Sequence, residues 1–116
     1  MSGLLSGKIA VITGGGGAMG GAQSSLFASE DASVCVADVN LEKAEDRSNL
    51  IIKNGGKALP YQLDVRDESE WAQLVKKVEN EFGPINILCN NAGANFRVSF
   101  EDQTLEMWNQ IIEVGL

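Results

Sequence analysis

The chain has 116 residues, of which 44% are hydrophobic and 22% are charged, the size and composition of one soluble globular domain. Its net charge of −7 argues against a nucleic-acid partner, because binding a phosphate backbone requires a clustered basic surface. No run approaches the roughly 20 apolar residues of a membrane helix, and the first residues lack the pattern of a secretory signal, so we expect a cytoplasmic protein without a membrane segment.

The first predicted unit is a strand over residues 8–13 followed by a helix over residues 18–30. The strand segment is short, rich in β-branched residues and almost wholly apolar, and it stops at four consecutive glycines. Such a run is typical of a strand that is buried on both faces of a parallel sheet. The helix is expected to turn inward its apolar residues at near-helical spacing, which are Met19, Ala22, Leu26 and Phe27.

The alternation of strand and helix continues along the chain. Asp67 with Glu70 three residues on predicts a box-like cap at the start of one helix, and Pro60 lies near the start of one strand. The further segments are strands at 33–38, 58–65 and 85–89, and helices at 41–53, at 68–82 and after Thr104. Four βα units of this kind predict an α/β fold, a Rossmann-type doubly wound parallel sheet with helices on both faces.

The chain ends at Leu116 within an apolar helical pattern, without a cap or a polar tail. We therefore expect residues 1–116 to form a single domain that is truncated. The apolar strand at 85–89 would then be an exposed edge of the sheet, and exposed apolar edges favour association. A homo-oligomer is expected on this ground.

The glycine-rich turn after the first strand is the main candidate binding element. It fits G-x-G-x-x-G from Gly15 to Gly20, and also T-G-x-x-x-G-x-G from Thr13 with Ala18 at the second-last glycine. Without Cβ atoms, the chain can turn sharply and a phosphate can approach the main-chain N–H groups at the positive end of the next helix. A flexible turn is the alternative, but a strand before and a helix after favour phosphate binding. A P-loop is disfavoured because Gly20 is followed by Gly21, not lysine.

Asp38 follows Gly20 by 18 residues, at the end of the second predicted strand. At this place a carboxylate can accept hydrogen bonds from the ribose hydroxyls of a dinucleotide, and it repels a 2′-phosphate. Neither the next residues, Val39 and Asn40, nor the glycine turn offer a basic side chain. NAD is therefore favoured over NADP, with an acidic cap on the next helix as the alternative role of Asp38.

The two cysteines, Cys35 and Cys89, each lie inside an apolar run. Reduced and buried side chains are expected at such positions, rather than a disulfide or metal ligands.

Together these residues resemble the short-chain dehydrogenase/reductase family, over the whole chain. The residues that carry the resemblance, in this order and spacing, are Thr13 and Gly14 with Gly20, Asp38, Asp64 and Val65, and the run Asn90, Asn91, Ala92 and Gly93. The resemblance implies the NAD-binding part of an oxidoreductase that transfers hydride between a nicotinamide cofactor and a small-molecule alcohol or carbonyl substrate.

The resemblance also implies a role for each matching residue. Asn90 is implied to tie the central sheet together. In the cofactor site, the pyrophosphate turn would contain Gly14, Gly17, Met19 and Gly20, the ribose would be bound by Asp38, the adenine would be bordered by Asp64 and Val65, and the floor would be lined by Asn91, Ala92 and Gly93.

Two residues depart from the family pattern. Ala18 stands where the family usually has glycine, and Gly115 where it usually has the asparagine of its catalytic tetrad. The family's catalytic Ser and Tyr-x-x-x-Lys would lie beyond Leu116, and Tyr61 has Val65 rather than lysine four residues on. No catalytic residue and no metal ligand is therefore assigned in this chain. The alternative functions are a non-catalytic nucleotide-binding module or pseudoenzyme, and another Rossmann-type domain such as an epimerase or a nucleotide-sensing regulator.

Overall fold

A computed structural model describes residues 3–91 of the chain, so the helix predicted after Thr104 lies outside the described residues. Strands and helices alternate throughout the described part, as predicted. The elements are β1 (Ile9–Thr13), α1 (Ala18–Ser29), β2 (Ser33–Asp38), α2 (Leu41–Lys53), β3 (Lys57–Gln62), α3 (Glu68–Glu81) and β4 (Ile87–Asn90). Within residues 3–91, none of the helices is long and apolar enough to cross a membrane.

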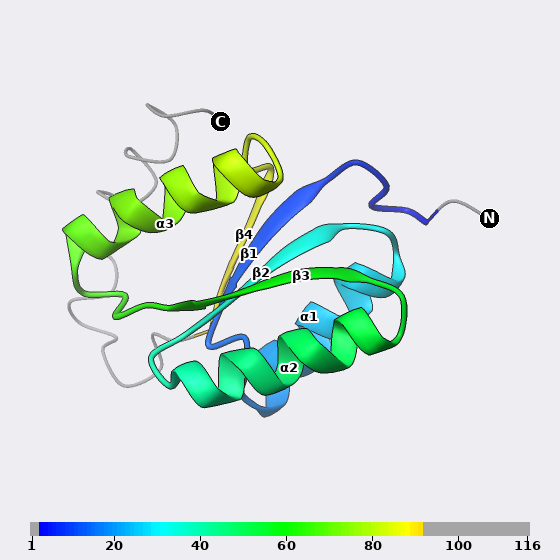
Figure 1. Cartoon of the computed structure of the whole chain (residues 1–116), viewed down its shortest axis with the longest axis horizontal. Coiled ribbons are helices and arrows are strands. Elements are labelled where there is room, and N and C mark those ends of the chain that lie inside the picture. The colour runs from blue at the N-terminus through cyan, green and yellow to red at the C-terminus, as the bar shows by residue number, and fades with distance from the viewer. Residues whose placement is uncertain (1–2, 92–116) are drawn as a thin grey trace.

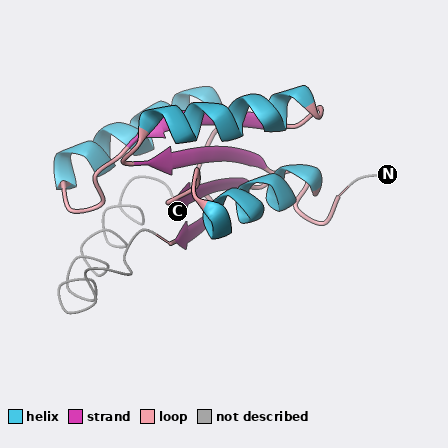
Figure 2. Ribbon diagram, turned by 90° about the horizontal axis from the view of Figure 1, so that it is seen from below, coloured by secondary structure: helices cyan, strands magenta, loops and turns pink. Residues whose placement is uncertain are grey.

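The four strands form one parallel sheet in the order β3-β2-β1-β4. In the register of the sheet, Val11 of β1 lies between Cys35 of β2 and Leu88 of β4. Figure 2 shows the strand arrows pointing in the same direction. The chain thus runs outward from β1 to β3 and returns to the other side of β1, which confirms the predicted Rossmann-type doubly wound α/β fold.

The helices cover both faces of the sheet, with α1 and α2 on one side and α3 on the other (Figure 1). Alternate strand residues therefore enter two separate cores. Val11 and Cys35 pack in the core beneath α3, whereas Ile12 and Val36 pack in the core beneath α1 and α2. This arrangement requires strands that are apolar on both faces, as the sequence predicted for β1 and β2.

The inward face of α1 differs from the prediction. Met19 and Leu26 are 70% and 58% exposed, and Ala22 is exposed as well, while Phe27 is half-buried. The buried positions of α1 are instead occupied by small residues, namely Gly20, Gly21, Ser24 and Ala28. Small residues occupy these positions because α1 lies so close to the glycine turn and the sheet that a larger side chain has no space.

Asparagine and aspartate side chains cap the other two helices. Asn40 accepts a hydrogen bond from the N–H of Lys43 at the start of α2. Asp67 accepts from the N–H groups of Ser69 and Glu70 at the start of α3. The predicted box is incomplete, because the Glu70 carboxylate accepts from the backbone N–H of Asp64, at 3.1 Å, instead of that of Asp67.

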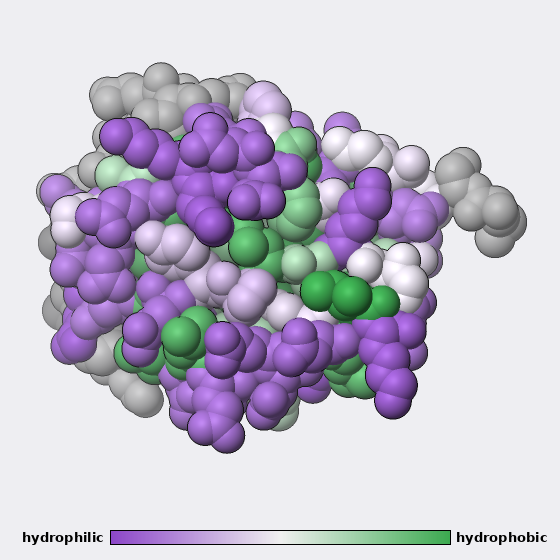
Figure 3. Space-filling view, viewed as in Figure 1, coloured by the Kyte–Doolittle hydropathy of each residue, from purple (hydrophilic) through white to green (hydrophobic). Residues whose placement is uncertain are grey.

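The edge strands are β3 and β4. The strand predicted at 58–65 is Lys57–Gln62, and Pro60 is tolerated there because, among residues 3–91, β3 pairs with β2 alone. Figure 3 shows this face as mostly hydrophilic over α2 and α3, with hydrophobic side chains between them, where β3 lies. In the described part β4 pairs only with β1, and association of copies through this edge stays a prediction.

Ser48 of α2 places an unsatisfied polar group in the core. Its side chain is buried, and within residues 3–91 its hydroxyl is the buried side-chain group with no hydrogen-bond partner. Removing an unsatisfied buried hydroxyl relieves its desolvation cost, so Ser48→Ala should raise the free energy of unfolding by about 1 kcal/mol. The matched control is Ser24→Ala, since the buried Ser24 hydroxyl donates to the Gly20 carbonyl at 2.8 Å. Urea unfolding of both variants should give opposite signs, and a destabilised Ser48→Ala would contradict this account.

Candidate functional site

The polar residues selected from the sequence meet at one edge of the sheet. Because the strands are parallel, their carboxyl ends lie together, and Thr13, Asp38 and Asn90 are the last residues of β1, β2 and β4. The strand order reverses between β1 and β4, which places a crevice for ligands beyond the carboxyl ends of these two strands. This edge is the candidate site.

The glycine turn connects β1 to α1 at the centre of this edge. Gly14 has a φ of 62°, a conformation that favours glycine, and a Cβ on Gly20 would overlap the carbonyl oxygen of Gly14. Gly17 is the N-cap of α1, and it offers no side chain to the N–H groups of the first turn. These N–H groups, at the positive end of the helix, suit a phosphate. Met19 lies on this first turn with its side chain exposed.

The carboxylate of Asp38 lies beside the glycine turn and is held at both oxygens. Oδ2 accepts a hydrogen bond from the N–H of Gly16 at 3.1 Å, and Oδ1 accepts one from the N–H of Asn40 at 2.9 Å. The side chain is buried, with 8% of the residue exposed. Capping of α2 is done by Asn40, so the alternative role of Asp38 as a helix cap is wrong.

A pocket of about 350 Å³ opens next to Asp38. It brings together residues that the sequence placed at the ends of three strands. Its lining is Gly14, Asp38, Val39, Leu63, Asp64, Val65 and Arg66. Four of these, Gly14, Asp38, Asp64 and Val65, are predicted site residues, while the other three, Val39, Leu63 and Arg66, were not predicted. The sequence signal that could have indicated Arg66 is its position two residues after Asp64.

Arg66 and Asp64 form an exposed ion pair at the rim of the pocket. The guanidinium Nε donates to Oδ1 and Nη2 donates to Oδ2, both at 3.0 Å. The same hydrogen bonds from Arg66 lower the pKa of the Asp64 carboxyl. Asp64 is therefore ionised at neutral pH, and both of its oxygens already accept hydrogen bonds.

Helix α3 fixes the wall of the pocket from behind. The indole N–H of Trp71 donates to the carbonyl oxygen of Val65 at 2.9 Å, and Glu70 accepts from the N–H of Asp64. Trp71 is 1% exposed, in the core beneath α3. The segment after β3 is thus tied at its main chain to a rigid helix.

On the other side of the turn, β4 is tied to β1 by side chains. The Thr13 hydroxyl donates to the side-chain oxygen of Asn90 at 2.6 Å and accepts from the N–H of Asn91 at 3.0 Å. The Asn91 amide donates to Gln23 of α1 at 2.6 Å and to the Thr13 carbonyl at 3.3 Å. Asn90 ties the sheet together, as expected, and Gln23 is a partner that sequence reasoning missed. The predicted residues Ala92, Gly93 and Gly115 lie outside the described residues.

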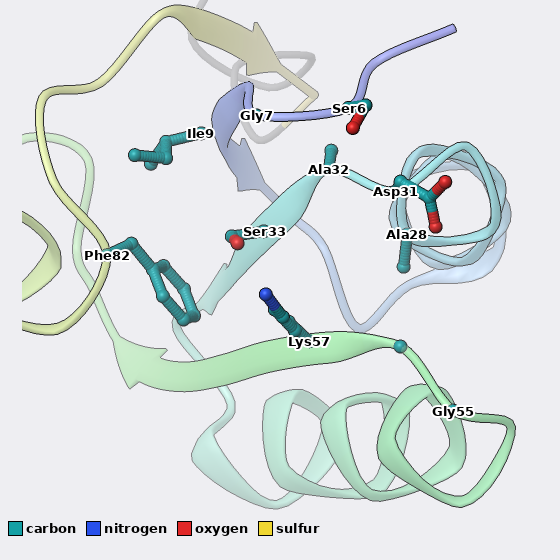
Figure 4. A pocket seen from close by; sticks show the side chains of 11 residues that line it. Ser6, Gly7, Ile9, Ala28, Asp31, Ala32, Ser33, Gly55, Lys57 and Phe82 are labelled. Atoms are coloured by element: carbon teal, nitrogen blue, oxygen red, sulfur yellow. The ribbon is translucent and has the colours of Figure 1, made fainter. Parts of the chain in front are cut away.

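A larger hollow, of about 430 Å³, lies at the opposite end of the strands (Figure 4). It is lined by the first residues of three strands, Ile9, Ser33 and Lys57, together with Phe82. In open parallel sheets ligands bind at the carboxyl ends of the strands, so the smaller pocket beside Asp38 is the better candidate.

Burial raises the pKa of three titratable groups of the described part. Burial raises the pKa of the Cys35 thiol to about 12 and also raises the pKa of Cys89, so both thiols are neutral. Both are free, but only Cys35 is buried as expected, whereas Cys89 is half-buried. Burial, with the nearby charge of Glu70, raises the pKa of Tyr61, whereas a tyrosine general base requires a lowered one. Among residues 3–91, no three His, Cys, Asp or Glu side chains come together as a metal site.

Comparison with known proteins gives consistent matches. The family model described as short chain dehydrogenase matches residues 8–116. The chain is 38% identical over 115 residues to 2,5-dichloro-2,5-cyclohexadiene-1,4-diol dehydrogenase from Sphingobium indicum, an alignment that covers 99% of this chain and 46% of that protein. The chain therefore spans less than half the length of this relative.

Two solved structures are similar in fold. A hydroxysteroid dehydrogenase from Escherichia coli superposes with a TM-score of 0.82 and 30% identity, over 92% of this chain and 52% of that one. A candidate D-mannonate oxidoreductase from Haemophilus influenza, solved with bound NAD, gives a TM-score of 0.71 and 29% identity over 75% of this chain and 31% of its own.

Proposed function

Because the chain belongs to the short-chain dehydrogenase family, we propose that it is the NAD-binding part of an oxidoreductase. In such an enzyme the nicotinamide ring, when bound, supplies or accepts a hydride, and the substrate is a small alcohol or carbonyl compound. The chain spans less than half of its dehydrogenase relative, and the part that we assign to the described residues is to bind and orient the cofactor. What we say of the substrate and the catalytic groups of the whole protein is part of the same proposal.

The residues present fit a dinucleotide. At Gly20 the helix lies so close to the turn that a Cβ would overlap the carbonyl oxygen of Gly14, so glycine lets the turn fold tightly onto the first turn of α1, whose N–H groups suit a pyrophosphate. The pocket beyond it, bordered by Asp38 and Val65, is of a size for an adenosine. We assign the pyrophosphate to Gly14, Gly17, Met19 and Gly20, the adenine to Asp64 and Val65, and the floor to Asn91, Ala92 and Gly93.

The choice of NAD depends on Asp38, and this residue carries the proposal. Its two oxygens are fixed by main-chain N–H groups of Gly16 and Asn40, and each oxygen keeps a further lone pair for a ribose hydroxyl. A fixed, buried carboxylate would repel the 2′-phosphate of NADP.

Asp38→Asn tests this assignment. We expect the unaltered chain to bind NAD more tightly than NADP in calorimetric titrations. The variant should weaken NAD binding by about 10- to 100-fold, because a charge-assisted hydrogen bond contributes about 1.5–3 kcal/mol. It should leave NADP binding unchanged or improve it.

The matched control is Asp31→Asn. Asp31 also accepts a hydrogen bond from a backbone N–H, that of Gly3, but it lies at the opposite end of the strands. This variant should bind NAD as the unaltered chain does. Equal affinity of the unaltered chain for NAD and NADP, or tighter NADP binding, would overturn the role of Asp38.

A further inference from the structure

We propose that Arg66 is a cofactor-binding residue of this chain, whose flat guanidinium stacks on the adenine base while Asp64 holds it in place. This inference rests on the proposed binding of a dinucleotide and adds a residue to that site. In this inference Asp64, besides bordering the adenine, also positions Arg66.

Arg66 is fixed before any ligand arrives. Its side chain is 53% exposed, yet three hydrogen bonds join it to Asp64: from the main-chain N–H and Nε to Oδ1, and from Nη2 to Oδ2, each 3.0 Å long. Two parallel hydrogen bonds of this kind set the plane of the guanidinium. The rotamer entropy of the long side chain is thus already lost in the free protein, which lowers the cost of a further contact.

Asp64 itself is well anchored. Its main-chain N–H donates to the Glu70 carboxylate at the start of α3, and the next carbonyl, of Val65, accepts from Trp71. Both carboxylate oxygens of Asp64 accept hydrogen bonds from Arg66, which hold the guanidinium beside it. Asp64 and Arg66 both line the pocket.

The pocket supplies a place for a base next to Arg66. Arg66 and Val39 line it from the segments that follow two neighbouring strands, β3 and β2, and Asp38 at the end of β2 lines it as well. Val39 is 67% exposed and offers an apolar surface. A planar purine suits this combination, since guanidinium groups stack on aromatic rings and apolar side chains cover the rest of a ring.

A purely structural ion pair makes a different prediction. Exposed pairs contribute only about 0–1 kcal/mol to stability, so loss of Arg66 would then leave nucleotide binding unchanged. Stacking on the base and a purely structural role of Arg66 are distinguished by whether the effect of its loss on ligand affinity depends on the presence of the base.

The test is calorimetric titration of the full chain and its variants with NAD, NADP, AMP and ribose 5-phosphate. Arg66→Ala is expected to weaken NAD and AMP by the same factor, about tenfold, and to leave ribose 5-phosphate unchanged. Arg66→Lys keeps the charge but not the plane, and should restore little of the loss. Asp64→Asn should give the same base-dependent loss to a smaller extent.

The matched control is Lys77→Ala, which removes an exposed cation paired with Glu81 at 3.7 Å on α3, away from the pocket lining. This variant should bind all four ligands normally. Thermal melting of each variant establishes that it is folded.

Unchanged NAD affinity of Arg66→Ala would overturn the inference, and so would an equal loss for ribose 5-phosphate. A loss confined to NADP would also overturn it, because Arg66 would then contact a 2′-phosphate. These outcomes leave NAD binding by the unaltered chain intact. If the unaltered chain bound none of the nucleotides, the proposed function would fail together with the inference.

Discussion

Replacing Gly20 by alanine is expected to abolish measurable NAD binding and to lower the free energy of unfolding by about 3 kcal/mol, the upper part of the range for overpacked sites. The new Cβ would overlap the carbonyl oxygen of Gly14 and come within 3.1 Å of the Cα of Gly15. Both neighbours are main-chain atoms of the turn itself, so relief requires the turn to open. An opened turn no longer presents its N–H groups to a pyrophosphate.

The adjacent glycine of the same helix provides the control. The three atoms nearest to a Cβ at Gly21 would all belong to the guanidinium of Arg47, the first at 2.7 Å, and the end of a long side chain moves easily. Gly21→Ala should therefore leave NAD binding unchanged and, through helix propensity, be neutral or stabilising by up to about 1 kcal/mol. Urea unfolding followed by circular dichroism, with calorimetry for NAD, compares the two variants. Normal NAD binding by Gly20→Ala would refute the role of this glycine.

Trp71→Ala is expected to cost about 3–5 kcal/mol of stability, the range for truncating a buried aromatic residue. The indole is almost fully buried in the core beneath α3, where it packs with residues that include Val11 and Leu74. Since small domains have a total stability of only about 5–15 kcal/mol, the variant should be partly unfolded at 37 °C. Circular dichroism melting measures this, and a melting temperature within a few degrees of the unaltered chain would show that the core tolerates the cavity.

Trp71→Phe separates packing from the hydrogen bond to the pocket wall. Phenylalanine keeps most of the apolar contact but leaves the Val65 carbonyl without the indole N–H, at a cost of about 1 kcal/mol. We expect a several-fold loss of NAD affinity, because this wall borders the pocket that we propose for the adenine. Val78→Ala is the matched core variant, since Val78 is buried in the same cluster but does not line the pocket. Compared with Trp71→Phe, Val78→Ala should lose more stability and less NAD affinity. The reverse order would contradict the link between Trp71 and the site.

The elements that the sequence predicted best are those with the strongest local pattern. The second strand, β2, and the helix after it, α2, have the predicted bounds, 33–38 and 41–53. A strand buried on both faces is an unbroken apolar run, and an amphipathic helix with Asn40 as its cap has a clear start. The ends of β3 and β4 differ from the prediction by a few residues, because strand ends depend on pairing with neighbours.

The face of α1 could not be read from its apolar residues. Periodicity selects large side chains such as Leu26, but close packing against the sheet selects small ones such as Gly20 and Ser24. The positions of the site residues followed from the rule that parallel strands end at one edge. Their partners did not follow, because Gln23 and Arg66 reach the site only through the way that α1 and the segment after β3 are placed.

The threonine at the end of β1 has a consequence for the order of folding. Thr13 contacts Asn90 and Asn91, which lie 77 and 78 residues further along the chain. Closing a loop of this length costs entropy before any contact is gained, and such distant contacts form late. The glycine turn and α1 can therefore appear early in refolding, whereas the floor of the site is completed only when the last described strand docks. NAD binding should consequently follow, and not guide, the assembly of the sheet.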